Sequence, residues 1–246
     1  MDRLEYCYHT HTSRCGHAWG KDEEFVLSAI KAGIKRLGFS DHIFFPDVIQ
    51  PGVRGSYDLL DDYLNSIHSL KEKYKDQIDI IVGFEVEYGD AYLDYYRWLL
   101  NEKQVDYLIM GQHFLVKKGT LSYFSSIEDY VTSAEKGLDT GLFKYIAHPD
   151  IFVMFNRGWD SSLEPYARRI LKKCEETNTP IEINILGLRG NRLYPNDEFF
   201  ELAREYKVKV VAGVDAHEPN QFSKEAFDLA FNYAKKHHLE IIDFKI

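Results

Sequence analysis

Short apolar runs alternate with longer amphipathic segments along the whole chain, and this alternation limits the possible folds more than any other feature. The apolar runs lie at residues 4–9, 36–41, 78–85, 105–112, 143–147, 181–186 and 208–214. Residues 80–82 (Ile-Ile-Val) and 208–212 (Val-Lys-Val-Val-Ala) have the β-branched content of strands that are buried on both faces. Apolar residues at helical spacing mark the segments between the runs, at 22–33, 57–75, 90–103, 127–139, 161–177, 196–206 and 222–238.

Strands that alternate with helices indicate a parallel sheet, and seven repeats favour a closed barrel over an open sheet. The chain has 246 residues, and α/β barrels of roughly 250 residues routinely form one domain. No low-complexity tract or Pro/Gly/Ser-rich stretch separates two halves. We therefore expect an α/β fold with one domain over residues 1–246. Gly33 is expected to end the first helix, and the last run, 239–246, could supply one more strand.

Composition excludes several classes of protein. With 45% hydrophobic and 28% charged residues, the chain is neither disordered nor fibrous. No apolar run approaches the roughly 20 residues that cross a bilayer, and the start, MDRLEYCYHTHT, does not resemble a signal peptide. The net charge of −9 argues against nucleic-acid binding. Three cysteines are too few for a disulfide framework, so we expect a cytoplasmic protein with neither membrane nor nucleic acid as a partner.

Histidines gather where the predicted strands end. Seven of the ten histidines lie at or just beyond the end of a predicted strand, namely His9, His11, His17, His42, His113, His148 and His217. Glu85 and Asp215 also come at strand ends. Because the carboxyl ends of barrel strands meet at one mouth, we expect these side chains to lie close together. Alternate residues of a strand share a face, so both rings of His9-x-His11 could reach one cation. Imidazole and carboxylate together suit zinc, iron or manganese.

The remaining candidates for the metal site have simpler interpretations. A lone His113 or His148 is more often an ordinary core or surface residue, and only the whole set of ligands favours a metal site. Cys15 lies between His11 and His17 and is either a soft ligand or a bystander packed in the loop. The other three histidines, His68, His237 and His238, fall inside predicted helices and are interpreted as helix residues.

Six motifs in order resemble the polymerase and histidinol phosphatase (PHP) family. They are HTHTSRCGHA, GFSDH, GFEVE, GQHF, AHPD and DAHEP, and they span residues 6 to 219. Within that family the sequence is most similar to the monofunctional histidinol-phosphate phosphatases. The resemblance implies a distorted seven-stranded (β/α) barrel of TIM-like form. It also implies two or three divalent metal ions (zinc, iron or manganese) at the barrel mouth.

The resemblance also assigns the metal ligands. The first ion would be held by His9, His11, Glu85 and Asp215. Glu85 would bridge to a second ion held by His113 and His148, and His17, His42 and His217 would hold a third. All nine positions carry a residue capable of the role.

The same resemblance implies the reaction and the groups that bind its substrate. Arg189 matches an arginine that binds substrate phosphate in this subfamily, and Arg157 is a second candidate. The expected activity is hydrolysis of L-histidinol phosphate to L-histidinol and inorganic phosphate, a step of histidine biosynthesis, by attack of a metal-bridging hydroxide. Glu85, Asp215 and His217 are the candidate catalytic residues, and either of the last two could protonate the leaving alkoxide.

Other functions stay open at this point. The nearest alternative is a phosphoesterase of the same family that acts on another small phosphomonoester or on a nucleotide. An amidohydrolase-like metal hydrolase is less favoured, because such barrels usually show a bridging lysine or a different order of histidines. A barrel that binds metal without catalysis is also possible. Neither the physiological metal nor the oligomeric state can be read from the sequence.

Overall fold

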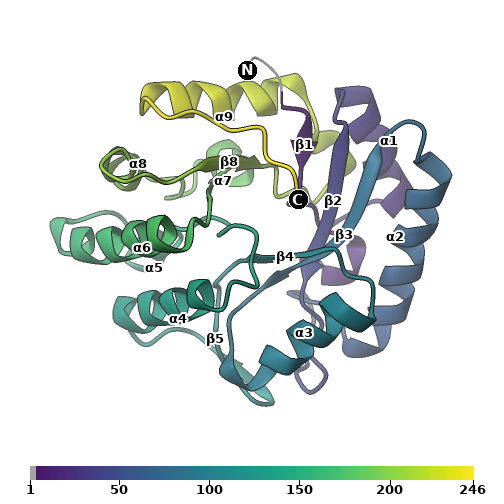
Figure 1. Cartoon of the computed structure of the whole chain (residues 1–246), viewed down its shortest axis with the longest axis horizontal. Helices are drawn as coiled ribbons and strands as arrows, with labels where there is room; N and C mark the ends of the chain where they lie inside the picture. Colours follow the sequence, from purple (N-terminus) through teal and green to yellow (C-terminus); the bar gives the residue numbers. More distant parts are fainter. Residues whose placement is uncertain (1–3) are drawn as a thin grey trace.

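Parallel strands and helices alternate along residues 4–246, which are the residues that the computed structural model describes (Figure 1). The first three residues of the expected domain 1–246 lie outside this range. The parallel strands are β1 (Tyr6–Cys7), β2 (Arg36–His42), β3 (Asp79–Val86), β4 (Tyr107–Met110), β7 (Ile181–Asn184) and β8 (Val210–Gly213). They pair in the orders β1-β2-β3-β4 and β7-β8.

Single bridges close these two groups of strands into a ring. Ile146 pairs with Met110 on one side and Ile181 on the other, and Thr10 pairs with Ala216. The predicted strand at 143–147 therefore takes its place between β4 and β7. Its one formal bridging residue is Ile146, but the N–H groups of Lys144 and Ala147 also bond to the carbonyls of Leu108 and Met110. Over the described residues, the seven strand positions form the distorted α/β barrel that the sequence predicted.

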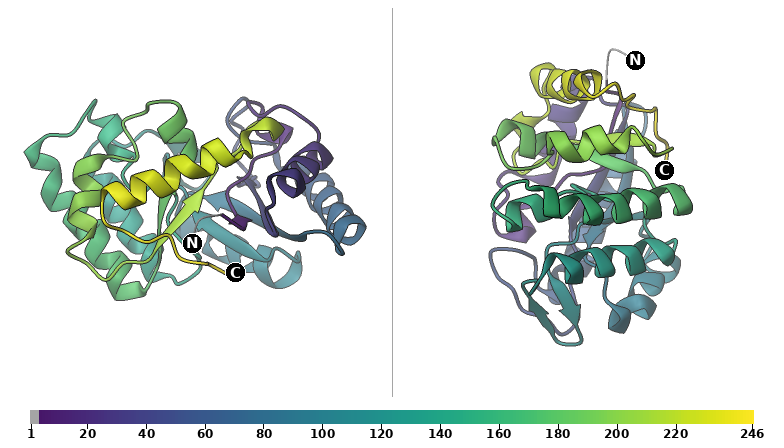
Figure 2. Two further views of the ribbon diagram at one scale, coloured as in Figure 1. Left: turned by 90° about the horizontal axis from the view of Figure 1, so that it is seen from above. Right: turned by 90° about the vertical axis from the view of Figure 1, so that its left-hand side faces the viewer.

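The helices cover the outside of the barrel. The long ones are α1 (Asp22–Ala32), α2 (Leu60–Tyr74), α3 (Leu93–Glu102), α4 (Ile127–Asp139), α6 (Glu164–Thr177) and α9 (Lys224–Lys236), and the shorter ones are α5 (Phe152–Phe155), α7 (Ile185–Arg189) and α8 (Asp197–Ala203). Figure 2 shows α4, α6, α8 and α9 stacked side by side, and α1 to α3 cover the opposite part of the sheet (Figure 1). None of the helices within residues 4–246 is long and apolar enough to cross a membrane.

Local sequence sets where several helices begin and end. Gly33 adopts a left-handed φ of 83° and its N–H bonds to the carbonyls of the last turn of α1, so the predicted helix end is confirmed. Ser126 and Ser223 cap α4 and α9, since each side chain accepts a hydrogen bond from the N–H three residues later. The predicted helices at 57–75, 90–103 and 161–177 each start with a 3₁₀ turn, over Tyr57–Leu59, Asp90–Tyr92 and Ser161–Leu163.

The core inside the barrel is built around Tyr107. Its hydroxyl donates to the carbonyls of Tyr8 (2.8 Å) and Phe39 (3.0 Å), which ties β4 to the chain of β1 and β2. Glycines make room for the ring, because a Cβ at Gly38 or Gly83 would lie 2.3 or 2.4 Å from Tyr107 atoms. This packing fixes the strands whose ends carry the predicted ligands.

Two short insertions and the C-terminal run depart from the simple repeat. After β4, an antiparallel hairpin of β5 (Leu115–Lys117) and β6 (Thr120–Ser122) precedes α4, and α5 follows the Ile146 bridge. Neither insertion is predicted by the pattern of apolar residues. The C-terminal run forms a single bridge, Ile241 to Val210, and its carbonyls accept hydrogen bonds from the hydroxyls of Tyr6 and Tyr8. It is therefore bound to the barrel without becoming a full strand.

Candidate metal centre

All nine side chains predicted to bind metal ions lie together at the carboxyl ends of the strands. His9 and His11 follow β1, His42 ends β2, Glu85 lies in β3, His113 follows β4, His148 follows the Ile146 bridge, Asp215 and His217 follow β8, and His17 follows a 3₁₀ turn at Ser13–Cys15. The barrel thus brings together residues that are as far apart in the chain as 9 and 217, as expected for the mouth of a parallel barrel.

Glu85 lies at the centre of this cluster and is 1% exposed. Its Oε1 faces His148 Nε2 (2.8 Å) and His113 Nε2 (3.6 Å), and its Oε2 faces His42 Nδ1 (3.1 Å), His9 Nε2 (3.5 Å) and His11 Nε2 (3.5 Å). Gly111 of the GQHF motif makes room for the carboxylate, because a Cβ there would lie 1.9 Å from Glu85 Oε1. One carboxylate with both oxygens facing imidazole nitrogens has the arrangement needed to bridge two cations.

Asp215 approaches the same cluster from β8. Its Oδ1 lies 3.1 Å from His11 Nε2 and 3.5 Å from His9 Nε2, and its Oδ2 accepts a hydrogen bond from Asn184 Nδ2 (3.1 Å). The residue has a left-handed φ of 53°, a conformation that Asp tolerates better than most residues. His9, His11 and Asp215 therefore form one group of donors that could hold a metal ion.

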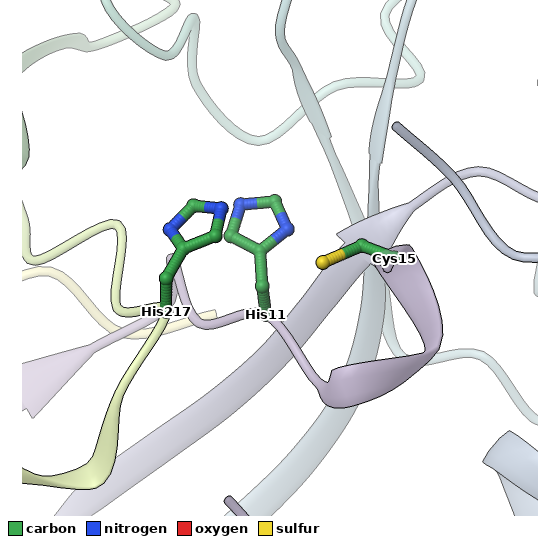
Figure 3. A group of neighbouring side chains, drawn as sticks. All are labelled: His11, Cys15 and His217. Carbon is green, nitrogen blue, oxygen red and sulfur yellow. The ribbon is translucent and has the colours of Figure 1, made fainter. Parts of the chain in front are cut away.

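A third group lies nearest the solvent and consists of His17, His42 and His217. Their donor atoms lie within 4.8 Å of one another, and the Nε2 atoms of His17 and His217 are 2.9 Å apart. The ring of His217 also stacks on that of His11, with centroids 4.2 Å apart, so the outer group adjoins the first (Figure 3).

Cys15 lies beside these rings, with its sulfur directed towards His11 (Figure 3). Burial, with a smaller effect from the charge of Asp41, raises the pKa of the Cys15 thiol to about 12. The donor atoms of His11, Cys15 and His217 nevertheless lie within 4.8 Å of one another, and a bound cation deprotonates its thiol ligand. Both interpretations of Cys15, soft ligand and packed bystander, therefore fit the structure.

Carboxylates lie beside the ring nitrogens of the histidines that point away from the cluster. Glu182 Oε1 lies 2.8 Å from His9 Nδ1, Asp41 Oδ1 lies 3.5 Å from His11 Nδ1, and Glu87 Oε1 lies 3.4 Å from His113 Nδ1. Each ring thus turns one nitrogen to the cluster and the other to an acid, an arrangement that orients histidine ligands in metal sites. Sequence reasoning did not assign Asp41 or Glu87 this part, although both stand within the motifs GFSDH and GFEVE.

Several donor atoms in the cluster have no hydrogen-bond partner among the described residues. They include His9 Nε2, His11 Nε2, His42 Nδ1 and Asp215 Oδ1, and these four are all buried. A buried polar atom without a partner costs about 1–3 kcal/mol, so four that face one another indicate a missing partner. Nitrogen and oxygen donors of this kind suit divalent cations, and the cluster has enough of them for more than one ion.

The charge states of the acids suit metal binding. Burial alone would raise the pKa of Glu85 and Asp215, but the neighbouring histidines, His113 for Glu85 and His9 for Asp215 first among them, hold both well below their usual range. Burial lowers the pKa of His42 and His217 to about 3, so both rings are neutral and can ligate. Against the effect of burial, nearby carboxylates raise the pKa of His11 to about 9. His11 is therefore protonated in the absence of metal, and a bound dication would replace the positive charge of that proton.

A pocket of about 450 Å³ opens above the cluster. Predicted ligands, including Glu85 and His217, line its floor, and its other walls carry aromatic and apolar side chains. Arg192 is the arginine that lines this pocket, and its Nη1 donates to the hydroxyl of Tyr194 (2.8 Å).

The structure does not place Arg189 or Arg157 in the lining of the pocket, and the phosphate-binding role stays a prediction for both. Both are exposed, and Arg189 is the last residue of α7. The chain folds back after this helix, where the N–H of Arg192 bonds to the carbonyl of Gly187 (2.9 Å). This turn brings Arg192 to the pocket in place of Arg189. The sequence held a signal for it, because Arg192 belongs to the same segment, INILGLRGNRLYPN.

Known proteins with related sequences are phosphatases by name. A probable histidinol-phosphatase of Deinococcus radiodurans is 26% identical, covering 87% of this chain and 86% of that protein. A probable phosphatase of Clostridium acetobutylicum is 28% identical, over 85% of this chain and 77% of its own. Among solved structures, the fold is similar to that of histidinol phosphate phosphatase from Lactococcus lactis subsp. lactis complexed with zinc, L-histidinol and phosphate. That similarity has a TM-score of 0.69 at 17% identity and covers 97% of this chain and 95% of the other.

The family itself is established by a match over most of the chain. A family model described as the PHP domain matches residues 8–185, a range that contains six of the seven predicted histidine ligands and Glu85. The barrel and the buried cluster of histidines and carboxylates at its strand ends agree with that assignment. The chain therefore belongs to the PHP-domain family.

Proposed function

We propose that this protein is a metal-dependent phosphatase of small phosphomonoesters, and that L-histidinol phosphate is the first substrate to test. The observation that supports this most is the set of unpaired, buried nitrogen and oxygen donors beneath an open pocket. Such a floor can hold several dications next to a bound ester. Relatives at 24–28% identity are named histidinol-phosphatase or only phosphatase, which supports the reaction class more strongly than the substrate.

Each of the nine donors has a proposed role in this site. His9, His11, Glu85 and Asp215 would hold one ion, Glu85, His113 and His148 a second, and His17, His42 and His217 a third. When bound, divalent ions of this kind lower the pKa of coordinated water and neutralise phosphoryl oxygens. The choice among zinc, iron and manganese is left to experiment.

Arg192 is the group that we propose for the substrate phosphate. Its guanidinium lines the pocket and has no ion-pair partner among the residues that the structure describes. Among the described residues, the guanidinium contacts Tyr194: Nη1 donates a hydrogen bond to its hydroxyl, and the Cζ of Arg192 lies 5.9 Å from the centre of its ring. Several N–H groups are therefore left for a phosphate, which arginine binds in a bidentate manner.

Proton transfer is assigned to Asp215. The carboxylate lines the pocket and is ionised, since His9 and His11 hold its pKa well below the usual range against the effect of burial. Beside the ester it would be placed to pass a proton from the attacking water to the leaving alkoxide. Burial lowers the pKa of His217 to about 3, so its ring is neutral and not a cationic acid, and its proposed role is that of a ligand.

The test is phosphate release from L-histidinol phosphate, measured beside sugar phosphates and nucleotides. The protein is stripped with chelator and reloaded with manganese, zinc or iron. We expect turnover that disappears on stripping and returns on reloading, with histidinol phosphate preferred. Metal-dependent turnover in which another ester is preferred would keep the reaction and replace the substrate. Absence of turnover with every metal and ester would contradict the proposal.

A further inference from the structure

The pocket above the cluster has an apolar side that the proposed chemistry does not use. We call it the aromatic wall and define it as Phe114, Tyr123, Met154 and Phe155. Tyr123 is 80% exposed, and Met154 and Phe155 are each 38% exposed. Large apolar side chains exposed together inside a pocket are typical of a surface that a ligand covers.

The two insertions into the barrel repeat supply this wall. Phe114 directly follows the predicted ligand His113, and Tyr123 follows β6, so both belong to the hairpin region. Their ring centres are 5.4 Å apart at 45°. Met154 and Phe155 come from α5, the short helix after the Ile146 bridge. The wall thus follows the same strand ends as the metal ligands, and both line one pocket of about 450 Å³.

Phe114 is held in place from behind. The guanidinium of Arg54 lies 5.9 Å from the centre of its ring, and Arg54 is buried and bound to Glu87 by two hydrogen bonds (2.7 and 3.1 Å). A ring backed by a fixed cation cannot move aside easily, so Phe114 presents a constant surface to the pocket.

Charge restricts what the wall can bind. Within residues 4–246, Arg192 is the only charged residue that lines the pocket apart from the predicted metal ligands. The wall therefore offers no carboxylate to an ammonium group and little hydrogen bonding to a sugar. Polar groups left without partners there would lose free energy, whereas a neutral ring gains from stacking on aromatic side chains.

We propose that the aromatic wall binds a neutral aromatic ring in the alcohol part of the ester and makes the enzyme selective for ring-bearing phosphomonoesters. This inference rests on the proposed function, since the phosphate must lie at the cluster and Arg192. An unprotonated imidazole satisfies it, and so does a phenyl ring, whereas the amino group of histidinol contributes little. Sugar and short alkyl phosphates lack the ring and are poor substrates.

The experiment compares 2-phenylethyl phosphate with propyl phosphate in the metal-loaded enzyme and in Tyr123 variants. For the wild type we expect kcat/KM to be at least 10-fold higher for the ring ester, and within about 10-fold of the value for histidinol phosphate. Tyr123→Ala lowers kcat/KM of the ring ester about 5- to 10-fold, mainly through KM, and leaves propyl phosphate within twofold. Tyr123→Phe retains the ring and restores wild-type values. Because Tyr123 is exposed, its loss does not endanger folding, and the melting temperature checks this.

A binding measurement separates this inference from the proposed reaction. Non-hydrolysable 2-phenylethyl and propyl phosphonates are titrated into the metal-loaded protein by calorimetry, and we expect the ring compound to bind at least 5-fold more tightly, a difference that Tyr123→Ala abolishes. Turnover without ring preference, or an equal effect of Tyr123→Ala on both esters, would overturn the aromatic wall and leave the reaction standing. Ring preference in binding without turnover of any ester would overturn the proposed function and support the wall.

Discussion

At the scale of single residues, Glu85 is the position where a buried charge depends most on its neighbours. Its carboxylate is buried among imidazoles, and those imidazoles keep its pKa well below the usual range. Burying a charge without partners would cost far more than the site could offset. The same residue can therefore hold negative charge in the core and serve two cations at once.

We expect Glu85→Gln to lower kcat/KM by about 10³-fold or more, because a neutral amide cannot bridge two cations. Metal content should fall by at least one ion per chain when measured by elemental analysis. The matched control is Glu240→Gln, which makes the same change at an exposed position outside the pocket. Near-normal turnover of a metal-analysed Glu85→Gln protein would contradict the assignment of the centre.

The two neighbouring arginines, Arg192 and Arg189, provide a second test at this scale. Since Arg192 lines the pocket and Arg189 does not, Arg192→Ala should lower kcat/KM about 10- to 100-fold, as the loss of a charge-assisted hydrogen bond would. Arg189→Ala should change it less than threefold. Steady-state kinetics on both variants measure this difference. A large loss of kcat/KM in Arg189→Ala and a small one in Arg192→Ala would support the phosphate-binding role predicted for Arg189.

The buried pair of Arg54 and Glu87 supports His113 and makes a third residue-scale prediction. Burial would raise the pKa of Glu87, but Arg54 and His113 lower it to about 2. Arg54→Met leaves this carboxylate buried without its partner and should reduce the free energy of unfolding by about 3–5 kcal/mol. The double variant with Glu87→Gln should recover at least half of that loss in urea denaturation, whereas strictly additive losses would show that the two side chains act independently.

At the scale of elements, short helices are held by contacts at their ends. Asp197 begins α8, and its carboxylate binds Lys236 Nζ (2.5 Å) and His237 Nε2 (2.9 Å) at the end of α9. The two helices are neighbours in the stack of Figure 2. This one carboxylate therefore joins the first turn of one helix to the last turn of the next, where both helix dipoles also favour the charges present.

The pH dependence of this contact follows from the pKa of Asp197. Partial burial would raise that pKa, but hydrogen bonds from Lys236 and His237 lower it. A folded-state pKa below the unfolded one gives stability above about pH 4, which is lost as the pH falls. Asp197→Asn should therefore cost less than about 1 kcal/mol at pH 7, because the pair is half exposed, and the cost should shrink as the pH falls below about 4.

Glu198 is the control for this helix contact. It lies in the same turn of α8 and has no ion-pair partner among the described residues, so Glu198→Gln should show little change at either pH. The measurement is urea denaturation of both variants between pH 3 and 7. A penalty of Asp197→Asn that stays constant down to pH 3 would show that the carboxylate charge is not its cause.

At the scale of the whole molecule, the barrel concentrates negative charge and unpaired donors at its mouth. The chain carries a net charge of −9, and the centre adds buried carboxylates that face one another across histidines. Metal ions would bind only the folded barrel, because the donors come from all along the chain. Binding to the folded state alone stabilises it by mass action.

Removal of metal should therefore destabilise the fold as well as stop catalysis. Metal held at about 1,000 times its Kd contributes roughly 4 kcal/mol per site, so stripping should lower Tm by roughly 10 °C in a chain of this size. Differential scanning calorimetry before stripping, after stripping and after reloading measures this. An unchanged Tm after complete removal would contradict selective binding of the ions to the folded barrel.

Much of the fold was predictable because its signals are local. The spacing of apolar residues located the strands and helices, and Gly33 marked a helix end. The run at 143–147 also takes the strand position that its apolar residues predict, with Ile146 bridged to both neighbours and further backbone hydrogen bonds to β4 and β7. The hairpin of β5 and β6 and the helix α5 carry no comparable periodic signal, because both are too short.

What the sequence alone determined is the α/β class and the gathering of the nine candidate donors at the strand ends. A residue at the end of a parallel strand must lie at the mouth of the barrel, so position in the chain sets position in space. What only the tertiary structure decided is that Arg192, and not Arg189, lines the pocket, and that Phe114, Tyr123, Met154 and Phe155 line it together. Both depend on how loops fold back over the mouth, as where Arg192 bonds to Gly187. Such turns depend on packing against elements that are distant in the chain, and the spacing of apolar residues in the sequence does not report that packing.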